Sequence, residues 1–475
     1  MSKVSILIPT YNRADLLPAT LDSALSQTYR DIEVIVSDNA STDNTPELMQ
    51  AYVERDHRVK YIRRSLNEGP IVNYSTAWNA AVGDYVAFLD SDDLFHPTKI
   101  ERQLQAFGAR PSDTGFVHTG FCYIDRHGKP LSRTVMLPEG DLFEPLLRYQ
   151  APIWFGAVLF TRKCIERTGW LDASVAQAAD VDYLLRATRL GYRAGCVQEA
   201  LYSHRHHGNN QSNNITGLAK ALFTIYERIY AEPGVAAKYK PWRNYTFANL
   251  HLDCVGRFLA SGQYESAGWH IAQALTLQPE WKQTLQPWVQ SLLYEYALGP
   301  TCDDLVAFVG GLFDSLPQDV PYLLQHRGLV FALAHVGTGL RAFYSGNTQE
   351  GRDHIVCALK HYPELPNRPA EFIELVCHFS SKLPVDDPGH FASSIFDQLP
   401  DSAKQLRGVR SRVLSKINLA RAFYAWAARD LPRVRRQVIA AIRHRPSAAL
   451  NRGVMSIFTR SIAIPAFNSS LQPSG

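Results

Sequence analysis

The sequence predicts an α/β fold with a mostly parallel sheet and helices on both faces, followed by an all-α helical-repeat domain. Three observations support this division. Apolar runs of strand length alternate with helical spacing over residues 4–89, strand signals stop near Ile215, and two sequence markers then recur about every 84 residues. A chain of 475 residues is long enough for two or three domains, each with its own core.

Short and nearly continuous apolar runs mark the strands of the first half. Short runs that are apolar almost throughout are typical of strands buried on both faces of a parallel sheet. The strands are expected over Val4–Ile8, Ile32–Val36, Val59–Ile62 and Tyr85–Leu89.

Segments with helical spacing of apolar residues separate these strands. Ser41-Thr42-Asp43-Asn44 followed by Pro46 is a helix-start signal, because proline suits the first turn of a helix. The alternation of strand and helix predicts an open sheet that binds ligands beyond the carboxyl ends of its strands. The helices are expected over Ala14–Gln27, Pro46–Arg55 and Ile71–Val82.

Polar residues stand at the expected carboxyl ends of three strands. Pro9, Tyr11 and Arg13 follow the first strand, and Asp38 follows the second. Tyr11 could stack on a planar base, and Asp38 could accept a hydrogen bond from a ring N–H. Taken singly, each is better explained as an ordinary turn tyrosine or a residue near a helix N-cap. Together they favour a nucleotide site.

Asp90-Ser91-Asp92-Asp93 follows the fourth strand and places three carboxylates within four residues. Such groups repel one another and favour a nearby cation. Oxygen ligands suit a hard divalent ion such as Mg²⁺ or Mn²⁺, which commonly shares its shell with phosphate oxygens. The alternative is a solvated acidic turn before a helix that begins near Pro97.

Four motifs in this order resemble family 2 glycosyltransferases, over about residues 1–213. These are inverting enzymes of the Rossmann-like GT-A fold that use nucleotide sugars. The motifs are Val4-Ser5-Ile6-Leu7-Ile8-Pro9-Thr10-Tyr11-Asn12-Arg13, Val36-Ser37-Asp38-Asn39-Ala40-Ser41-Thr42-Asp43, Asn67-Glu68-Gly69 and Phe88-Leu89-Asp90-Ser91-Asp92-Asp93.

The resemblance implies roles for individual residues. Asp90-Ser91-Asp92 would be the DxD motif, in which Asp92 binds Mn²⁺ or Mg²⁺ and Asp90 contacts the ribose or the metal. The nucleotide, usually UDP, and its sugar would be held by Pro9, Tyr11, Arg13, Asp38, Asn67, Asp90 and Ser91. The acceptor would be a hydroxyl of a glycan, a lipid-linked molecule or a protein.

Two departures stand in the second motif. Asn39 and Ala40 replace an aspartate and a glycine that are common in this family, which leaves the nucleobase preference open. A nucleotidyltransferase, which shares much of this fold, is expected to have a glycine-rich loop after its first strand. The segment 9–13 contains no glycine, which argues against that alternative.

An inverting transfer also needs a base for the proton of the acceptor. Ala179-Asp180-Val181-Asp182 resembles the family's acidic pair at the head of an acceptor-side helix, with Ala179 in place of the usual first acid. Asp180 matches the position of the base. Asp182 is two residues away and cannot share its helix face, so it would be a supporting charge. The alternative is that both merely favour a helix N-terminus.

Ser203-His204-Arg205-His206-His207-Gly208 contains three histidines in four residues. A zinc site is not predicted, because no cysteine or second histidine pair lies near them. The resemblance implies that one histidine contacts the metal or the diphosphate. His206 fits best, with His204 and His207 left open.

The second half contains two recurring markers. Pro233, Pro317 and Pro400 differ by 84 and 83 residues, and so do Pro279, Pro363 and Pro446. This predicts three multi-helix units of about 84 residues over 214–466, stacked as a solenoid and similar to tetratricopeptide hairpins. The array could bind a protein, hold a homodimer or be a structural extension. Residues 467–475 are expected to be a disordered tail.

Composition limits the remaining function classes. The net charge of +4 gives no argument for nucleic acid, and seven scattered cysteines support neither disulfides nor a zinc site. No apolar stretch approaches the ~20 residues of a membrane span, and no secretory signal is recognised, so a cytoplasmic protein is expected. A second function class is a degenerate transferase domain that serves as a nucleotide-sugar-binding scaffold. Ala179 favours it, whereas Asp180 and the acidic cluster argue against it.

Overall fold

The structure is a computed structural model that describes residues 2–135, 137–151, 153–208, 210, 213–297, 299, 301–385, 387–427 and 430–463. The expected tail at 467–475 lies outside these residues. The chain divides into two compact units, and each is described by itself. One unit comprises Met1–Trp281 with Ser315–Pro317, and the other comprises Lys282–Asp314 with Gln318–Gly475.

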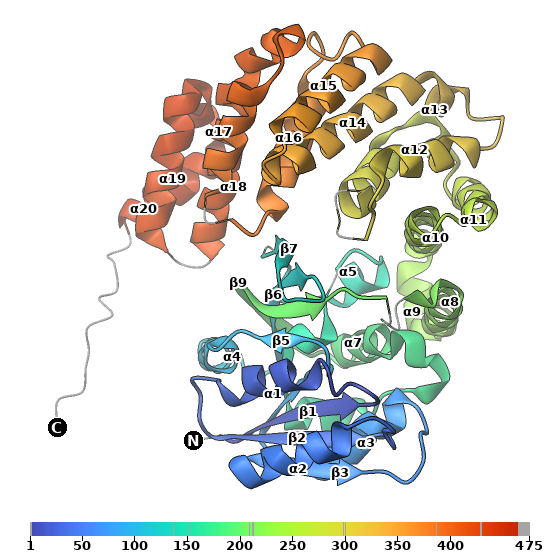
Figure 1. Cartoon of the computed structure of the whole chain (residues 1–475), viewed down its shortest axis with the longest axis vertical. Helices are drawn as coiled ribbons and strands as arrows, with labels where there is room; N and C mark the ends of the chain where they lie inside the picture. The colour runs from blue at the N-terminus through green and yellow to red at the C-terminus, as the bar shows by residue number, and fades with distance from the viewer. Residues whose placement is uncertain are drawn as a thin grey trace. The chain divides into compact units, whose positions relative to one another are not determined.

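The first unit begins with the predicted alternation and then adds strands and helices that the sequence did not reveal (Figure 1). Its strands are β1 (Val4–Thr10), β2 (Ile32–Asp38), β3 (Val59–Arg63), β4 (Tyr85–Phe88), β5 (Leu94–Phe95), β6 (Thr114–Ile124), β7 (Pro130–Thr134), β8 (Val158–Thr161) and β9 (Arg193–Arg205). Its helices are α1 (Leu17–Leu25), α2 (Thr45–Arg55), α3 (Pro70–Asn79), α4 (Lys99–Gly108), α5 (Phe143–Leu147), α6 (Arg162–Thr168), α7 (Ala179–Arg189), α8 (Ile215–Ala231), α9 (Pro233–Tyr239), α10 (Arg243–Ala260) and α11 (Tyr264–Leu277), with short 3₁₀ segments η1 (Phe155–Ala157) and η2 (Ala173–Ala178).

The strands form one sheet in the order β3-β2-β1-β4-β8-β6-β9-β5, with β7 on the side of β6. The pairs β3–β2, β2–β1 and β1–β4 are parallel, as the sequence predicts. Beyond β4 the sheet is mixed, because β8 runs antiparallel to both β4 and β6 while β9 runs parallel to β6. The α/β fold class is therefore confirmed, and a single rim collects the carboxyl ends of β1, β2 and β4.

Both faces of the sheet are covered, because alternate residues of a strand point to opposite faces. Ile6 and Ile8 of β1 pack in one core with residues of α1, α2 and α4. Leu7 packs in the other core with residues of α3, α6, α7 and α8. Residues of α8 and α10 belong to that second core, so these helices after β9 are part of the first unit. The domain boundary expected at residue 214 stays a prediction.

The second unit is helical throughout the part of it that the structure describes. Its elements are a π-helix (Trp288–Ala297), α12 (Leu305–Asp314), α13 (Pro321–Gln325), α14 (Arg327–Tyr344), α15 (Thr348–His361), α16 (Ala370–Lys382), α17 (Pro388–Gln398), α18 (Arg410–Ala427), α19 (Leu431–His444) and α20 (Arg452–Ala463), with 3₁₀ segments η7 (Asp401–Val409) and η8 (Pro446–Leu450). None of the described helices combines the length and the apolar character that crossing a membrane requires.

Three helical hairpins match one another in length. The helices α10, α14 and α18 have 18 residues each, and their partners α11, α15 and α19 have 14 each. Matching helices start 84 and then 83 residues apart, the spacing of the sequence markers. We call these pairs the first, second and third hairpins. Figure 1 shows α14 beside α15 and α18 beside α19. Their likeness to tetratricopeptide units stays a prediction.

Candidate active site

The carboxyl ends of β1, β2 and β4 bring the expected functional residues to one rim of the sheet. Thr10 is the register partner of Asp38, so the loop that carries Tyr11 and Arg13 leaves the sheet level with Asp38. On the other side of β1, Leu7 pairs with Phe88, and the acidic cluster follows directly. Tyr11 remains 43% exposed, so its ring is available to a ligand.

Asp38 is fully buried at the end of β2, and the protein fixes its carboxylate from two sides. Tyr61 Oη donates to Oδ2 at 2.6 Å, and the backbone N–H of Ser41 donates to Oδ1 at 2.8 Å. Arg63 Nε lies 3.8 Å from Oδ2. A carboxylate has about four acceptor positions, so these contacts leave Asp38 capacity for one more donor.

The two departures in the second motif have different structural consequences. Asn39 Nδ2 donates to Asn67 Oδ1 at 2.6 Å and to the carbonyl of Gly69 at 3.2 Å, which ties the loop after β2 to the loop before α3. An aspartate at position 39 could not donate these bonds. Ala40 has a φ of 65°, in the left-handed region that glycine adopts without strain. The structure thus shows why glycine is favoured at position 40.

Asp93, which the sequence left unassigned, is the most tightly held residue of the acidic cluster. It is fully buried. Tyr202 Oη donates to Oδ2, His204 Nδ1 lies 3.2 Å from the same oxygen, and the N–H of Arg205 donates to Oδ1 at 2.8 Å. Asp93 therefore joins the segment after β4 to the end of β9.

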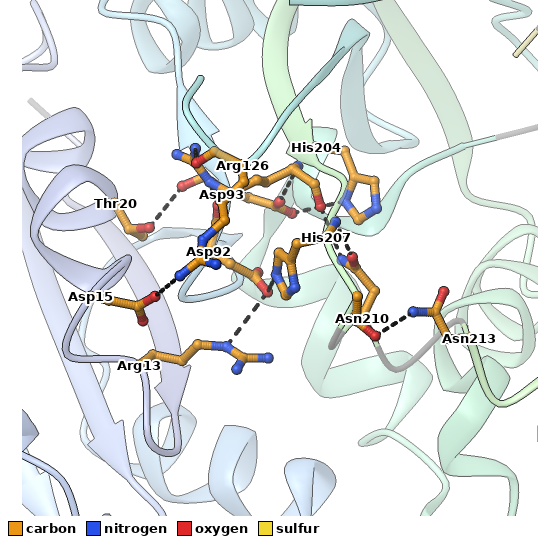
Figure 2. A network of polar contacts seen from close by, with 12 residues as sticks. Arg13, Asp15, Thr20, Asp92, Asp93, Arg126, His204, His207, Asn210 and Asn213 are labelled. Atoms are coloured by element: carbon orange, nitrogen blue, oxygen red, sulfur yellow. Dashed lines mark hydrogen bonds and ion pairs between the residues drawn. The ribbon is translucent and has the colours of Figure 1, made fainter. Parts of the chain in front are cut away.

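Asp92, its neighbour, is also buried, and its carboxylate points towards His207 and Arg13 (Figure 2). Its Oδ2 lies 2.9 Å from His207 Nε2 and 3.7 Å from Arg13 Nε. Burial opposes its ionised form, but the hydrogen bond from His207 and the charge of Arg13 outweigh burial and lower the pKa of Asp92. Among the three histidines left open, His207 is the one that meets Asp92, whereas a metal contact of His206 stays a prediction.

Asp90 stands at the exposed edge of the cluster, where Tyr74 Oη donates to its Oδ1 at 2.6 Å. Desolvation by the surrounding chain, followed by the charges of Asp93 and Asp92, raises the pKa of Asp90 to about 7. Water reaches the exposed side of the carboxylate and moderates the desolvation. Crowded negative charge of this kind is relieved by a cation.

The donor atoms at this rim fit a divalent ion that is shared with a ligand. No three histidine, cysteine, aspartate or glutamate side chains converge as a complete ligand set anywhere in the described part of the chain. Mg²⁺ is usually held by one or two carboxylates and completed by substrate phosphates and water. Asp92 and Asp90 could supply those carboxylates, so the residues fit a metal that arrives with a diphosphate.

Asp180 lies in the first turn of α7 and is partly buried. Burial raises its pKa, while the backbone N–H groups around it and the charge of Arg257 act in the opposite direction. Tyr183, three residues later and hence on the same helix face, packs on Phe155 with ring centroids 5.7 Å apart. Phe155 lies 4.5 Å from the ring of Phe88 in β4, so aromatic packing joins the start of α7 to the strand that ends at the acidic cluster.

Asp182 has a different partner. Its Oδ2 accepts from Arg186 Nε at 2.8 Å, and Arg186 also donates to the carbonyls of Thr168 and Trp170. Asp182 therefore orients an arginine that ties α7 to the preceding loop, while its role as a supporting charge in the site stays a prediction.

Several site residues escaped sequence reasoning. Tyr74, Tyr202 and Arg205 contact the acidic cluster, and Arg205 Nε also donates to the carbonyl of Asp92 at 2.7 Å. Trp154 stacks on His204 with centroids 4.2 Å apart, which fixes the ring beside Asp93. The only sequence signal was the polar run 203–208, which does not show that Tyr202 and Arg205 point to the cluster.

Comparison with known proteins gives a consistent result. The model of glycosyl transferase family 2 matches residues 5–162. TuaG of Bacillus subtilis (strain 168), whose name assigns it to teichuronic acid biosynthesis, is 31% identical over 48% of this chain and 88% of its own. The Escherichia coli UDP-Glc:alpha-D-GlcNAc-diphosphoundecaprenol beta-1,3-glucosyltransferase WfaP is 30% identical over 39% of this chain and 69% of its own.

A longer relative and two solved structures were also found. The Escherichia coli chondroitin synthase is 29% identical over 53% of this chain, but the match spans 37% of that protein. TarS of S. aureus in complex with UDP-GlcNAc aligns over 76% of this chain and 92% of its own, with 15% identity and a TM-score of 0.43. A Pyrobaculum calidifontis mannosyltransferase with GDP-Man and Mn²⁺ aligns over 75% and 85%, with 19% identity and a TM-score of 0.44.

Proposed function

The chain belongs to glycosyl transferase family 2 and is a glycosyltransferase, and from that premise we propose that it moves a sugar from a nucleotide diphosphate sugar to an acceptor hydroxyl with inversion. The observation that carries this proposal is that Asp92 lies beside Arg13 and Asp93 holds the end of β9, at the rim where β2 ends at Asp38 and Tyr11 follows β1. Ligands of open α/β sheets bind at such a rim.

The donor is proposed to be a UDP-sugar and the acceptor a glycan or a lipid-linked sugar. The name of WfaP gives it a UDP-glucose donor and a lipid-linked acceptor, which supports both choices. The exposed ring of Tyr11 would stack on the base, and the fixed carboxylate of Asp38 would accept from its N–H. Arg13 would face the diphosphate beside Asp92.

Asp180 is proposed as the base. As the acceptor oxygen forms a bond to the anomeric carbon, the bond from that carbon to the diphosphate oxygen breaks, and the electron pair leaves with the nucleotide. The acceptor proton passes to the Asp180 carboxylate. Burial raises the pKa of Asp180, which strengthens it as a base near neutral pH.

Mn²⁺ or Mg²⁺ is proposed as the cofactor, with Asp92 and Asp90 as the protein ligands. A bound divalent ion would neutralise the charge that develops on the departing diphosphate. Asp93 would not be a ligand in this scheme, because Tyr202, His204 and Arg205 already occupy its carboxylate. Its role would be to hold the segment that carries Asp92 in place.

The test is nucleotide release from a panel of UDP- and GDP-sugars, with and without lipid-linked sugar acceptors, in Mn²⁺, Mg²⁺ or EDTA. Asp92→Asn should abolish the effect of metal on donor affinity, measured by calorimetry. Asp180→Asn should keep donor affinity and lower kcat by about 10²–10⁴-fold. Asp84→Asn is the matched control, because Asp84 is an exposed carboxylate at the opposite end of β4.

Three results would contradict the proposal. Equal donor affinity with and without metal in the unsubstituted chain would exclude the metal. Unchanged kcat in Asp180→Asn would exclude that residue as the base. Donor binding without turnover on any acceptor would favour the alternative that the chain is a nucleotide-sugar-binding scaffold.

A further inference from the structure

The charge of this chain is strongly uneven along its length. Residues 401–475 contain fourteen lysines and arginines but only two acidic residues, which leaves 35 basic and 43 acidic residues in the first 400. A modest net charge thus conceals a strongly basic end and an acidic remainder. Charge of one sign concentrated in one segment indicates a partner of the opposite sign.

The basic residues of α19 lie on its outer side. Val434, Val438 and Ala441 are buried against α18 and α20. At 100° per residue, the exposed residues Arg433, Arg436, Ile439 and Arg443 share the opposite side of the helix. Arg445 and Leu450 follow, both exposed, as the chain leaves α19 through η8. We call Arg433, Arg436, Ile439, Arg443, Arg445 and Leu450 the basic surface.

The arginines of the basic surface differ from other basic residues of the same region in their pairing. Arg410 and Arg421 form ion pairs with Asp397 and Asp387 at 2.7 and 2.6 Å. Within the part of the chain that the structure describes, Arg433, Arg436 and Arg443 have no carboxylate within ion-pair distance. Their positive charges are therefore exposed to solvent.

The fold does not require these arginines. In the second hairpin, Glu350 and Asp353 of α15 occupy the positions of Arg433 and Arg436, 83 residues earlier, and they are exposed as well. Two helices of the same length with the same buried side therefore carry opposite charges at these two matching positions, whereas Lys360 matches Arg443 and has the same charge. Since packing is satisfied in both hairpins, the basic surface needs an explanation outside the fold.

Two large apolar side chains close to the arginines in the sequence are exposed as well. Leu450 is 83% exposed and Ile439 is 41% exposed. A nucleic acid or an acidic polysaccharide would be attracted by the arginines but would gain little from these two side chains. At a lipid surface, by contrast, apolar side chains enter the boundary between headgroups and acyl chains while basic residues contact anionic headgroups.

We propose that the basic surface docks on an anionic membrane surface and holds the protein there peripherally. Arg433, Arg436 and Arg443 contact lipid phosphates, and Ile439 and Leu450 enter the interface. This inference rests on the charge, exposure and pairing of the third hairpin and is independent of the transferase reaction proposed above.

The test is co-sedimentation of the full chain with vesicles of phosphatidylcholine alone or with phosphatidylglycerol added. We expect binding only to the anionic vesicles, weakened by salt. The triple variant Arg433→Glu, Arg436→Glu and Arg443→Glu should bind them on the order of 100-fold more weakly. The matched control is Lys163→Glu, Lys220→Glu and Lys360→Glu, which changes the charge equally at exposed positions elsewhere. It should lose no more than about five-fold.

A second variant separates a membrane from a soluble polyanion. Leu450→Ser should weaken vesicle binding by about ten-fold and leave binding to immobilised heparin unchanged. Absence of binding to anionic vesicles would overturn the proposal, as would equal losses in the two triple variants. Heparin binding without vesicle binding would also overturn it and would favour an acidic polymer. Circular dichroism of each variant checks that the helices are retained.

Discussion

The rim of the sheet and the three hairpins constrain their residues in different ways. At the rim, Asp93 accepts a hydrogen bond from Tyr202 on one carboxylate oxygen and from the Arg205 N–H on the other, whereas an asparagine would place a donor at one of these positions. In the three hairpins, matching buried positions keep apolar residues, whereas matching exposed positions differ in charge. Matching positions carry Ile271, Ile355 and Val438, whereas Glu350 is matched by Arg433. The rim thus specifies chemistry, and the hairpins specify only whether a position is apolar or exposed.

A paired set of polar residues shows the same freedom inside a hairpin. His251 and His270 face each other with Nδ1 atoms 2.8 Å apart in the first hairpin, and His335 and His354 do so at 3.0 Å in the second. The third hairpin has Asn418 and Gln437 at these positions. The hairpin therefore folds with different polar pairs between its two helices.

The largest expected effect is at the rim. Asp93→Ala should lower the free energy of unfolding by about 3–5 kcal/mol, because it leaves buried donors of β9 without an acceptor. Asp353→Ala on the outer side of α15 should change it by less than about 0.5 kcal/mol. Urea denaturation of both variants measures the contrast. Similar losses would show that the rim is no more constrained than the hairpins.

Glycine substitutions should change stability in opposite directions near the rim and in the helical second unit. A Cβ on Gly156 in η1 would lie 2.5 Å from the ring of Tyr202, so Gly156→Ala should destabilise the chain by about 1–3 kcal/mol. Gly310 in α12 has nothing within 4 Å of such a Cβ. Gly310→Ala should therefore stabilise by about 0.5–1 kcal/mol. Thermal unfolding of the two variants is the measurement, and destabilisation by Gly310→Ala would contradict the contrast.

The histidine pair of the first hairpin should make stability depend on pH. Burial lowers the pKa of His251 to about 3 and that of His270 to about 4. Both pKa values lie below the ~6.5 of a histidine in an unfolded chain. Between about pH 6.5 and 4 the unfolded chain therefore binds more protons than the folded chain. The free energy of unfolding should then fall as the pH falls from 6.5 towards 4, by on the order of 1 kcal/mol per pH unit.

A double substitution to the residues found in the third hairpin tests whether these histidines cause the pH dependence of stability. His251→Asn with His270→Gln should flatten the pH profile below ~6.5 and leave stability at pH 8 little changed. Urea denaturation across this pH range measures it. An unaltered slope would show that other groups cause the dependence.

The smallest effect is expected from exchanging charges between hairpins. Glu350→Arg with Asp353→Arg copies the third hairpin into the second and should change the free energy of unfolding by less than about 1 kcal/mol, mainly through the charge near the start of α15. Denaturation of this variant against the unsubstituted chain is the measurement. A larger loss would mean that the outer side of α15 is not free to vary.

The sequence predicted the elements whose signals are local. Apolar runs and helix-start residues located β1 to β4 and the helices between them, with ends that differ by a few residues. The helix α1 begins at Leu17 rather than Ala14, because the carbonyl of Arg13 accepts from the N–H groups of Leu16 and Leu17 in a turn before it. The pairing of β6 with β9 has no such signal, since it joins segments about eighty residues apart.

The candidate site divides in the same way. The acidic cluster and the polar residues after β1 and β2 were visible as patterns. The sequence did not show that Asp93 is the carboxylate held by buried partners. These partners lie 109 to 112 residues away in the sequence, and only the fold brings them together. The choice among the three histidines depends on the path of the chain beyond β9, which places His207 beside Asp92. The uneven distribution of charge was also present in the sequence, but the net charge of the whole chain does not reveal it.

The separation of charge along the chain has a consequence for handling the protein. A molecule with a basic end and an acidic remainder should bind both cation- and anion-exchange resins despite its small net charge. At low ionic strength, the basic end of one molecule attracts the acidic part of another, and dialysis into dilute buffer should cause turbidity that salt reverses. At about 0.1 M salt the screening length falls to roughly 10 Å, and the molecules should disperse.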